Sequence, residues 1–146
     1  MNNSIHVKAF AYFENNQRVF LFKFQDTKTG EYIYRPIGGT VEFGELSEEA
    51  LHREILEELN TKITIDSKPI VLESIFSFEN KKGHEVVFVF PCSFKEQCYY
   101  EIKDYQILES NGEKLVANWY LKSDFLLGVK RLVPEGLTKR LKLEQH

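Results

Sequence analysis

Residues 38–61 read GGTVEFGELSEEALHREILEELNT, a glycine-rich loop that leads directly into an amphipathic helix. The helix is predicted from Ser47, which we expect to be its N-cap, to about Leu59. Its apolar residues lie four positions apart, as on a face that packs against a core: Leu51, Ile55 and Leu59. Asn60 tolerates the left-handed conformation that ends many helices, so it is expected to stop this one.

Three carboxylates share a second face of the helix. Glu54, Glu57 and Glu58 stand three and four residues apart, and residues at that spacing are neighbours on a helix surface. Their mutual repulsion grows near a core, where the dielectric falls, so a cation is expected among them. A hard divalent ion with oxygen ligands suits this arrangement, and Mg²⁺ is favoured if phosphates complete its shell. The alternative is a solvated acidic face.

The loop before the helix favours the metal site over the solvated face. Gly38 and Gly39 allow the backbone to approach a ligand or to adopt positive φ. From Gly39, five residues lead to Glu45 and seven more lead to Arg53, which precedes Glu54-Ile55-Leu56-Glu57-Glu58. This order and spacing resemble the Nudix box, G-x5-E-x7-R-E-U-x-E-E-x-G-U, in which U is a bulky aliphatic residue. Every glycine, acid and arginine position matches up to the last of these acids.

The resemblance departs from the box at its end and continues outside it. Asn60 replaces the last glycine, and Thr61 replaces the final aliphatic residue. Other segments are similar to those of a bacterial, MutT-like Nudix subfamily: Tyr34-Arg35-Pro36-Ile37-Gly38-Gly39, Gly83-His84-Glu85, Trp119 and Leu132-Val133-Pro134-Glu135-Gly136-Leu137. The resemblance therefore spans most of the chain and implies the Nudix fold.

The expected fold is α+β, an α/β/α sandwich in which a mixed β-sheet carries the central helix and a C-terminal helix near residues 134–143. Apolar and aromatic segments predict strands over Ile5–Phe13, Arg18–Gln25 and Tyr32–Arg35. The short turns between these strands predict antiparallel pairing. Further strands are predicted over residues 63–65, 70–78 and 85–94. At this length the chain is expected to form one domain over residues 1–146.

Nudix hydrolases cleave the pyrophosphate linkage in a nucleoside diphosphate joined to another group X. The resemblance thus implies a Mg²⁺-dependent pyrophosphohydrolase, with Mn²⁺ as a substitute ion. The metal ligands it implies are Glu54, Glu57, Glu58 and the backbone of Gly39. The catalytic residues it implies are Glu54, Glu57, Arg53 and Glu85. Arg53 would orient a carboxylate by ion pairing, and the general base is either a glutamate of the box or Glu85.

The substrate side is less defined. The expected substrate-binding residues are Arg35, Gly38, Gly39 and His84. Four aromatic residues would either stack on a base or pack in the core: Tyr34, Phe76, Phe78 and Trp119. A nucleoside triphosphate or a small nucleotide conjugate is favoured, while sugar nucleotides, ADP-ribose and dinucleoside polyphosphates stay open. Homodimers are common among Nudix hydrolases, so a homodimer is compatible with the resemblance.

Composition excludes several other classes of protein. The 146 residues include 19 basic and 22 acidic ones, and a net charge of -3 argues against a surface for nucleic acid polymers. No apolar run approaches the ~18 residues of a membrane span. Cys92 and Cys98 form no metal pattern; either a disulfide or free thiols in a reducing cytosol would account for them. We expect a cytoplasmic enzyme, the alternative being a non-catalytic nucleotide-binding or regulatory module on the same fold.

Overall fold

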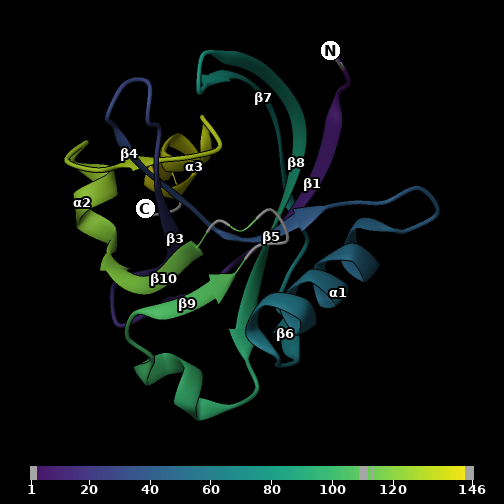
Figure 1. Ribbon diagram of the computed structural model, residues 1–146. Helices are drawn as coiled ribbons and strands as arrows, with labels where there is room; N and C mark the ends of the chain where they lie inside the picture. The colour runs from purple at the N-terminus through teal and green to yellow at the C-terminus, as the bar shows by residue number, and fades with distance from the viewer. Residues whose placement is uncertain (1–2, 109–111, 113, 144–146) are drawn as a thin grey trace.

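The computed structural model describes residues 3–108, 112 and 114–143, in which two sheets lie between helices (Figure 1). The first sheet has the order β5 (Ile37–Thr40), β1 (His6–Tyr12), β8 (Lys81–Phe94) and β6 (Ile63–Ile65), with β7 (Ile70–Phe78) also paired to β8. The second has the order β11 (Arg131–Leu132), β4 (Tyr32–Arg35), β3 (Arg18–Gln25), β10 (Lys114–Leu121) and β9 (Tyr105–Leu108), with β2 (Glu14–Asn15) paired to β3. The helices are α1 (Ser47–Leu59), the 3-10 helix η1 (Gln97–Glu101), α2 (Lys122–Leu126) and α3 (Leu137–Leu143).

The predicted α+β class is confirmed, and both sheets are mixed. The expected antiparallel pairing holds between β3 and β4, but β1 joins the other sheet, where it pairs antiparallel with β5 and parallel with β8. Parallel neighbours need a long crossover, and the connection from β1 to β8 contains α1. The prediction of local antiparallel pairing was therefore wrong for β1, because a strand's partner depends on distant segments.

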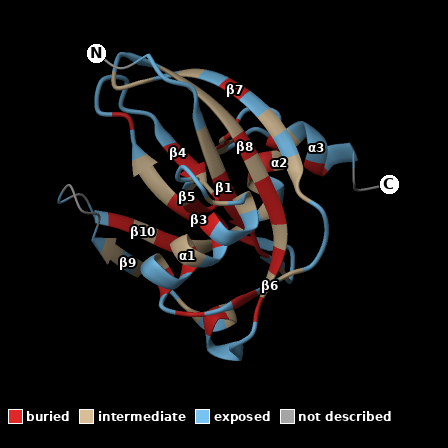
Figure 2. Ribbon diagram, turned by 90° about the vertical axis from the view of Figure 1, so that its right-hand side faces the viewer, coloured by how far each residue is buried: buried red, intermediate tan, exposed pale blue. Residues whose placement is uncertain are grey.

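The first hydrophobic cluster holds α1 against both sheets. Leu51, Ile55 and Leu59 are fully buried, as their spacing predicts. They pack in one cluster with Ala9 and Ala11 of β1, whose small side chains let the helix come close to the sheet. In Figure 2 the buried residues, drawn in red, lie mainly along the strands, among them β3, β8 and β10.

The two ends of α1 follow different rules. Leu46, with an extended backbone, is the N-cap, and its N–H donates to the Glu49 carboxylate at 2.8 Å. Ser47 is the first helical residue, so its expected role as the cap was wrong, because the Glu49 side chain already satisfies the backbone at this end. Asn60 ends the helix at φ 54° and ψ 40°, and its N–H donates to the Leu56 carbonyl, as predicted.

A second hydrophobic cluster covers the opposite side of the sheets. Phe125 of α2 and Leu137 and Leu141 of α3 are buried in the same cluster as Val87 and Val89 of β8. The predicted C-terminal helix is thus present and packed, and the molecule has helices on both sides of its sheets (Figure 1). Within the described residues, no helix has both the length and the apolar composition needed to cross a membrane.

Candidate active site

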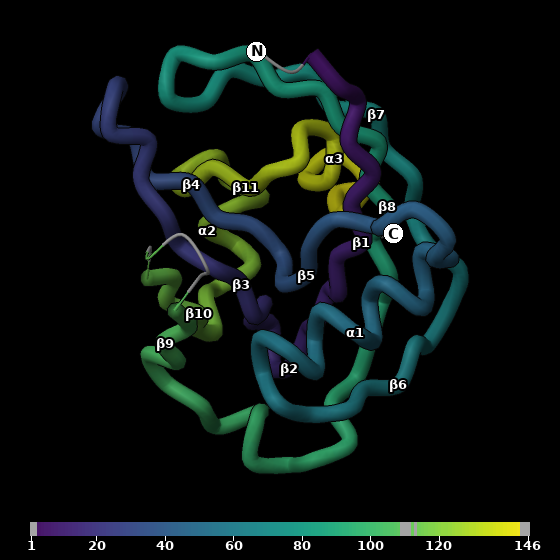
Figure 3. Tube along the Cα trace, turned by 45° about the vertical axis from the view of Figure 1, so that its right-hand side comes forward, coloured from purple at the N-terminus to yellow at the C-terminus, as the bar shows by residue number. Residues whose placement is uncertain are grey.

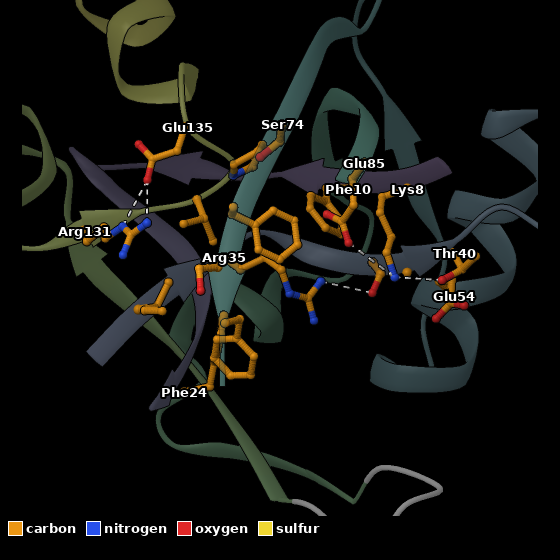
Figure 4. A pocket seen from close by; sticks show the side chains of 18 of the residues that line it. Lys8, Phe10, Phe24, Arg35, Thr40, Glu54, Ser74, Glu85, Arg131 and Glu135 are labelled. Atoms are coloured by element: carbon orange, nitrogen blue, oxygen red, sulfur yellow. Dashed lines mark hydrogen bonds and ion pairs between the residues drawn. The ribbon is translucent and has the colours of Figure 1, made fainter. Parts of the chain in front are cut away.

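A pocket of about 380 Å³ receives side chains from both sheets, from α1 and from the segment before α3 (Figure 4). The sequence-predicted site residues that line it are Arg35, Gly38, Gly39, Glu54, Glu58 and Glu85. Figure 3 follows the chain that brings the first five together, from β4 through β5 and the following loop into α1. The pocket therefore unites segments that the sequence predicted separately.

Arg53 ties the glycine-rich loop to the helix. Its Nε and Nη2 donate to the two carboxylate oxygens of Glu45 at 2.7 and 2.9 Å, a bidentate pair. Nη2 also donates to the Thr40 carbonyl at 3.0 Å, and Nη1 donates to Glu54 at 3.0 Å. A longer contact of 3.4 Å reaches Glu57. Arg53 does not itself line the pocket, so its geometry suits the orienting role that its motif position implies.

The Glu45–Arg53 pair changes the acidity of both groups. The hydrogen bond from Arg53, supported by one from the backbone N–H of Glu42, lowers the pKa of Glu45 from 4.5 to about 2. The same pair raises the pKa of the Arg53 guanidinium. Glu45 is therefore held as a carboxylate at neutral pH.

This shift predicts a contribution to acid stability. Because the folded-state pKa of Glu45 is depressed, the contribution is present above pH 4.5 and is lost as the pH falls toward about 2. The Glu45→Gln variant is expected to unfold less steeply with falling pH in that window, as followed by circular dichroism. Glu48→Gln, which changes an exposed acid in the first turn of α1, is the control. Equal acid slopes for the Glu45→Gln variant and the unsubstituted protein would contradict the assignment.

Gly39 makes room for the Glu54 carboxylate. A Cβ built on Gly39 would overlap the carboxyl carbon and both oxygens of Glu54. Gly38 has φ +147° and faces β1, and a Cβ built on it would overlap the Ala9 carbonyl oxygen. The absence of a side chain therefore matters differently at the two glycines. Gly39 makes room for a pocket carboxylate, whereas Gly38 allows β5 to pair closely with β1.

Gly39→Ala therefore predicts a selective loss. The added methyl group displaces a flexible carboxylate rather than backbone, so the fold is expected to survive. Activity is expected to fall about 10- to 100-fold, the scale of a 1 Å misplacement of a catalytic group. Steady-state kinetics with a melting curve measure both effects. Adding Glu54→Asp, which shortens the acid by one methylene, should recover part of the loss, and unchanged kinetics in Gly39→Ala would refute the role given to Glu54.

The three helix carboxylates stand in different environments. Glu54 and Glu58 line the pocket, and both carboxylate oxygens of Glu58 are buried. The Glu57 side chain is 59% exposed and lies outside the lining. Among the residues that the structure describes, no three acidic, histidine or cysteine side chains gather closely enough to hold a metal ion. The ligand atoms that the three glutamates offer are all carboxylate oxygens, which fits Mg²⁺. Glu57 is exposed, so its side chain has room to turn toward Glu54 and Glu58.

Glu85 and His84 point to different surroundings. Glu85 lines the pocket, and its carboxylate lies 3.9 Å from the Lys8 ammonium. His84 precedes it on β8, where successive side chains alternate between faces, and it is not among the lining residues. The structure thus brings Glu85, but not His84, to the acids of α1.

The predicted aromatic residues also separate. Phe76 and Phe78 line the pocket. Tyr34 is buried in the second hydrophobic cluster. Trp119 packs against the first, with its ring centroid 5.2 Å from that of Phe20. Alternation along β7 explains the first pair, since residues 76 and 78 share one face of the strand.

Several lining residues were missed by sequence reasoning: Lys8, Phe10, Phe24, Ser74, Arg131 and Glu135 (Figure 4). Alternation along β1 could have placed Lys8 with Phe10, because both occupy even positions of one strand. Arg131 pairs with Glu31 at 2.6 Å and with Glu135 at 2.8 Å. No local sequence pattern predicts that Arg131 and Glu135 line the pocket, since their position there depends on the whole fold.

Arg35 extends over the apolar wall of the pocket. Its Nη1 donates to the carbonyls of Pro36 and Gly38 at 3.2 and 3.3 Å. The guanidinium lies 4.8 Å from the ring centroid of Phe10 and 5.3 Å from that of Phe22, within the range of cation–π contact. Arg35 is therefore held beside the glycine loop, as a residue that meets an anion there would be.

Comparisons with known proteins identify the family of this chain and solved structures of similar fold. A family model described as the NUDIX domain matches residues 4–111. No curated protein sequence matches the chain. Among solved structures, the ORF135 protein of E. coli shares 17% identity with a TM-score of 0.58, over 97% of this chain and 92% of that one. A MutT protein from Bacillus halodurans shares 20% identity with a TM-score of 0.55, over 94% and 80%. A protein described as an ADP compounds hydrolase shares 13% with a TM-score of 0.50, over 88% and 63%.

Proposed function

The chain belongs to the NUDIX family of pyrophosphohydrolases, and on that premise we propose that it hydrolyses the pyrophosphate linkage of a nucleoside triphosphate or a small nucleotide conjugate with Mg²⁺. One observation carries the proposal: the carboxylates of Glu54 and Glu58 and the backbone of Gly39 meet in a pocket that also has aromatic walls. Such a pocket offers oxygen ligands for a hard cation and apolar surface for a base.

We propose that Glu54, Glu57, Glu58 and the Gly39 carbonyl hold the ion, with Mn²⁺ as a substitute. When bound, the ion neutralises a diphosphate and lowers the pKa of coordinated water. Arg53 keeps Glu54 and Glu57 oriented, and its pair with Glu45 keeps Arg53 in place. Phosphoryl transfer depends mainly on such positioning and on charge stabilisation.

Proton removal from the attacking water is proposed for one of two pocket carboxylates. Glu54 is held by Arg53 and lies against Gly39, next to the proposed ion. Glu85 lies on β8 beside Lys8. A loss of the acidic limb of the pH–rate profile on substitution by Gln would identify the base among the two.

The substrate is proposed to lie along the pocket. Its phosphates would meet Arg35 and the glycines of β5, while Phe76 and Phe78 would contact the base. His84 lies outside this path, so its place in substrate binding rests on the motif resemblance alone. The enzyme is further proposed to be one domain over residues 1–146 and to act in the cytoplasm, where its two free thiols, Cys92 and Cys98, would stay reduced.

A substrate panel tests the proposal. Nucleoside triphosphates, sugar nucleotides, ADP-ribose and dinucleoside polyphosphates are incubated with Mg²⁺, Mn²⁺ or EDTA, and the products are separated by chromatography. Turnover that requires a divalent ion is the expected result. Binding of a nucleotide without turnover would favour the non-catalytic module, and inactivity without any metal binding would overturn both metal site and reaction.

A further inference from the structure

Lys8 lies at the acidic end of the pocket, on a strand outside the sequence motif. The antiparallel register of β1 and β5 sets Lys8 opposite Thr40 and the next residue, Ala9, opposite Gly39. The Lys8 ammonium donates to the Thr40 hydroxyl at 2.8 Å and lies 3.9 Å from the Glu85 carboxylate. Figure 4 shows Lys8, Thr40, Glu54 and Glu85 together at one end of the pocket, away from Arg131 and Glu135.

This end of the pocket is rich in negative charge. Glu54 and Glu85 lie at this end, and Glu58 also lines the pocket, so an anionic substrate that enters must meet cations as well (Figure 4). Arg131 lies at the other end, in ion pairs with two glutamates. Lys8 is the lysine among the lining residues, and its flexible stem carries three donors that can be shared between protein and ligand.

The surroundings of Lys8 suit a residue that binds substrate. Its side chain is 21% exposed and that of Glu85 is 20% exposed, so the pair is open to the pocket yet shielded from bulk water. At 3.9 Å, the contact with Glu85 is longer than a hydrogen bond and attracts the ammonium through its charge. The hydroxyl of Thr40 fixes the direction in which the ammonium points.

Building on the proposed function, we propose that Lys8 binds a phosphate group of the substrate and that Glu85 and Thr40 position its ammonium. Glu85 is then a positioning residue, and the role of general base passes to Glu54. The strand register supports this division, since it sets Lys8 one residue pair from Gly39, where the Glu54 carboxylate lies.

Kinetics of four variants and one control variant test the assignment. Lys8→Met is expected to raise KM by at least about tenfold with little change in kcat, the scale of one hydrogen bond to a charged group. Lys8→Arg should recover part of the affinity because it keeps the charge. Glu85→Gln should also raise KM and keep the acidic limb of the pH profile, and the double variant should be no worse than Lys8→Met. Lys139→Met, on the exposed face of α3, is the control for charge alone.

The opposite pattern would overturn the assignment. If Glu85→Gln lowers kcat and removes the acidic limb while Lys8→Met leaves KM unchanged, Glu85 is the base and Lys8 is a structural counter-ion. Melting curves accompany each variant. Should Lys8→Met fail to fold, Lys8→Gln, which keeps a polar side chain, carries the same comparison.

Calorimetric binding of inorganic pyrophosphate in the presence of Mg²⁺ separates this inference from the hydrolase proposal. The unsubstituted protein is expected to bind pyrophosphate at least about tenfold more tightly than Lys8→Met. That result would support Lys8 as a phosphate ligand even if no nucleotide were hydrolysed. Equal affinities, or no binding to either protein, would overturn the assignment whatever the substrate panel shows.

Discussion

Glu57→Gln is expected to lower kcat/KM by at least about 1,000-fold, because it would remove one charged oxygen ligand of the proposed metal ion, and such an ion supplies several kcal/mol of transition-state stabilisation. The side chain is 59% exposed and its contact with Arg53 is long, at 3.4 Å, so the melting temperature should change little. Loss of activity without loss of stability is the mark of a ligand rather than of a structural acid.

Direct metal titration tests whether Glu57 binds the ion or only supports the fold of the site. The affinity for Mn²⁺, measured by electron paramagnetic resonance, should be much lower for the Glu57→Gln variant than for the unsubstituted protein. Glu48→Gln changes the same charge on an exposed site of α1 and should behave like the unsubstituted protein. Full activity and unchanged Mn²⁺ affinity in Glu57→Gln would remove Glu57 from the site.

Arg53→Met carries the second large effect, and it combines activity with stability. Loss of the guanidinium frees the bidentate bonds to Glu45 and the bonds to Glu54 and Thr40. Carboxylates that are no longer oriented should lower kcat/KM by at least about 100-fold, the scale of small misplacements in an active site. The melting temperature is expected to fall by about 5 °C because loop and helix lose their connection.

Arg53→Lys and Arg140→Met bracket this prediction. Lysine keeps the charge but cannot form the bidentate fork, so Arg53→Lys should recover stability more than activity. Arg140 is exposed on α3, and its removal should change neither. Near-normal kcat/KM in a folded Arg53→Met protein would show that the arginine does not position the carboxylates.

Local patterns predicted the parts of this protein whose physics is local. The bounds of α1 follow from the spacing of Leu51, Ile55 and Leu59 and from a left-handed stop at Asn60. The prediction of Ser47 as the N-cap was wrong because a helix cap depends on which side chain accepts from the first free N–H. Here the Glu49 carboxylate accepts from the N–H of Leu46. Residue type alone does not reveal that competition.

Pairing and pocket walls depend on segments far apart in the chain, so they were predicted less well. The parallel pairing of β1 with β8 brings Lys8 beside Glu85, and the spacing of residues within either strand does not predict this contact. The same holds for Arg131 and Glu135, which reach the pocket from the segment before α3. Glu54 and Glu58 could be predicted as a pair because one helix carries both, whereas the arrival of Lys8 and Arg131 in the same pocket required the fold.

Hydrolysis in water labelled with oxygen-18 tests the central claim most directly. With a substrate from the panel and Mg²⁺, mass spectrometry of the separated products is expected to show cleavage between two phosphorus atoms. The label should appear in one of the two phosphate-bearing products, and EDTA should abolish the reaction. Cleavage at a sugar–phosphate or terminal monoester bond, or equal turnover in EDTA, would contradict a metal-dependent pyrophosphohydrolase.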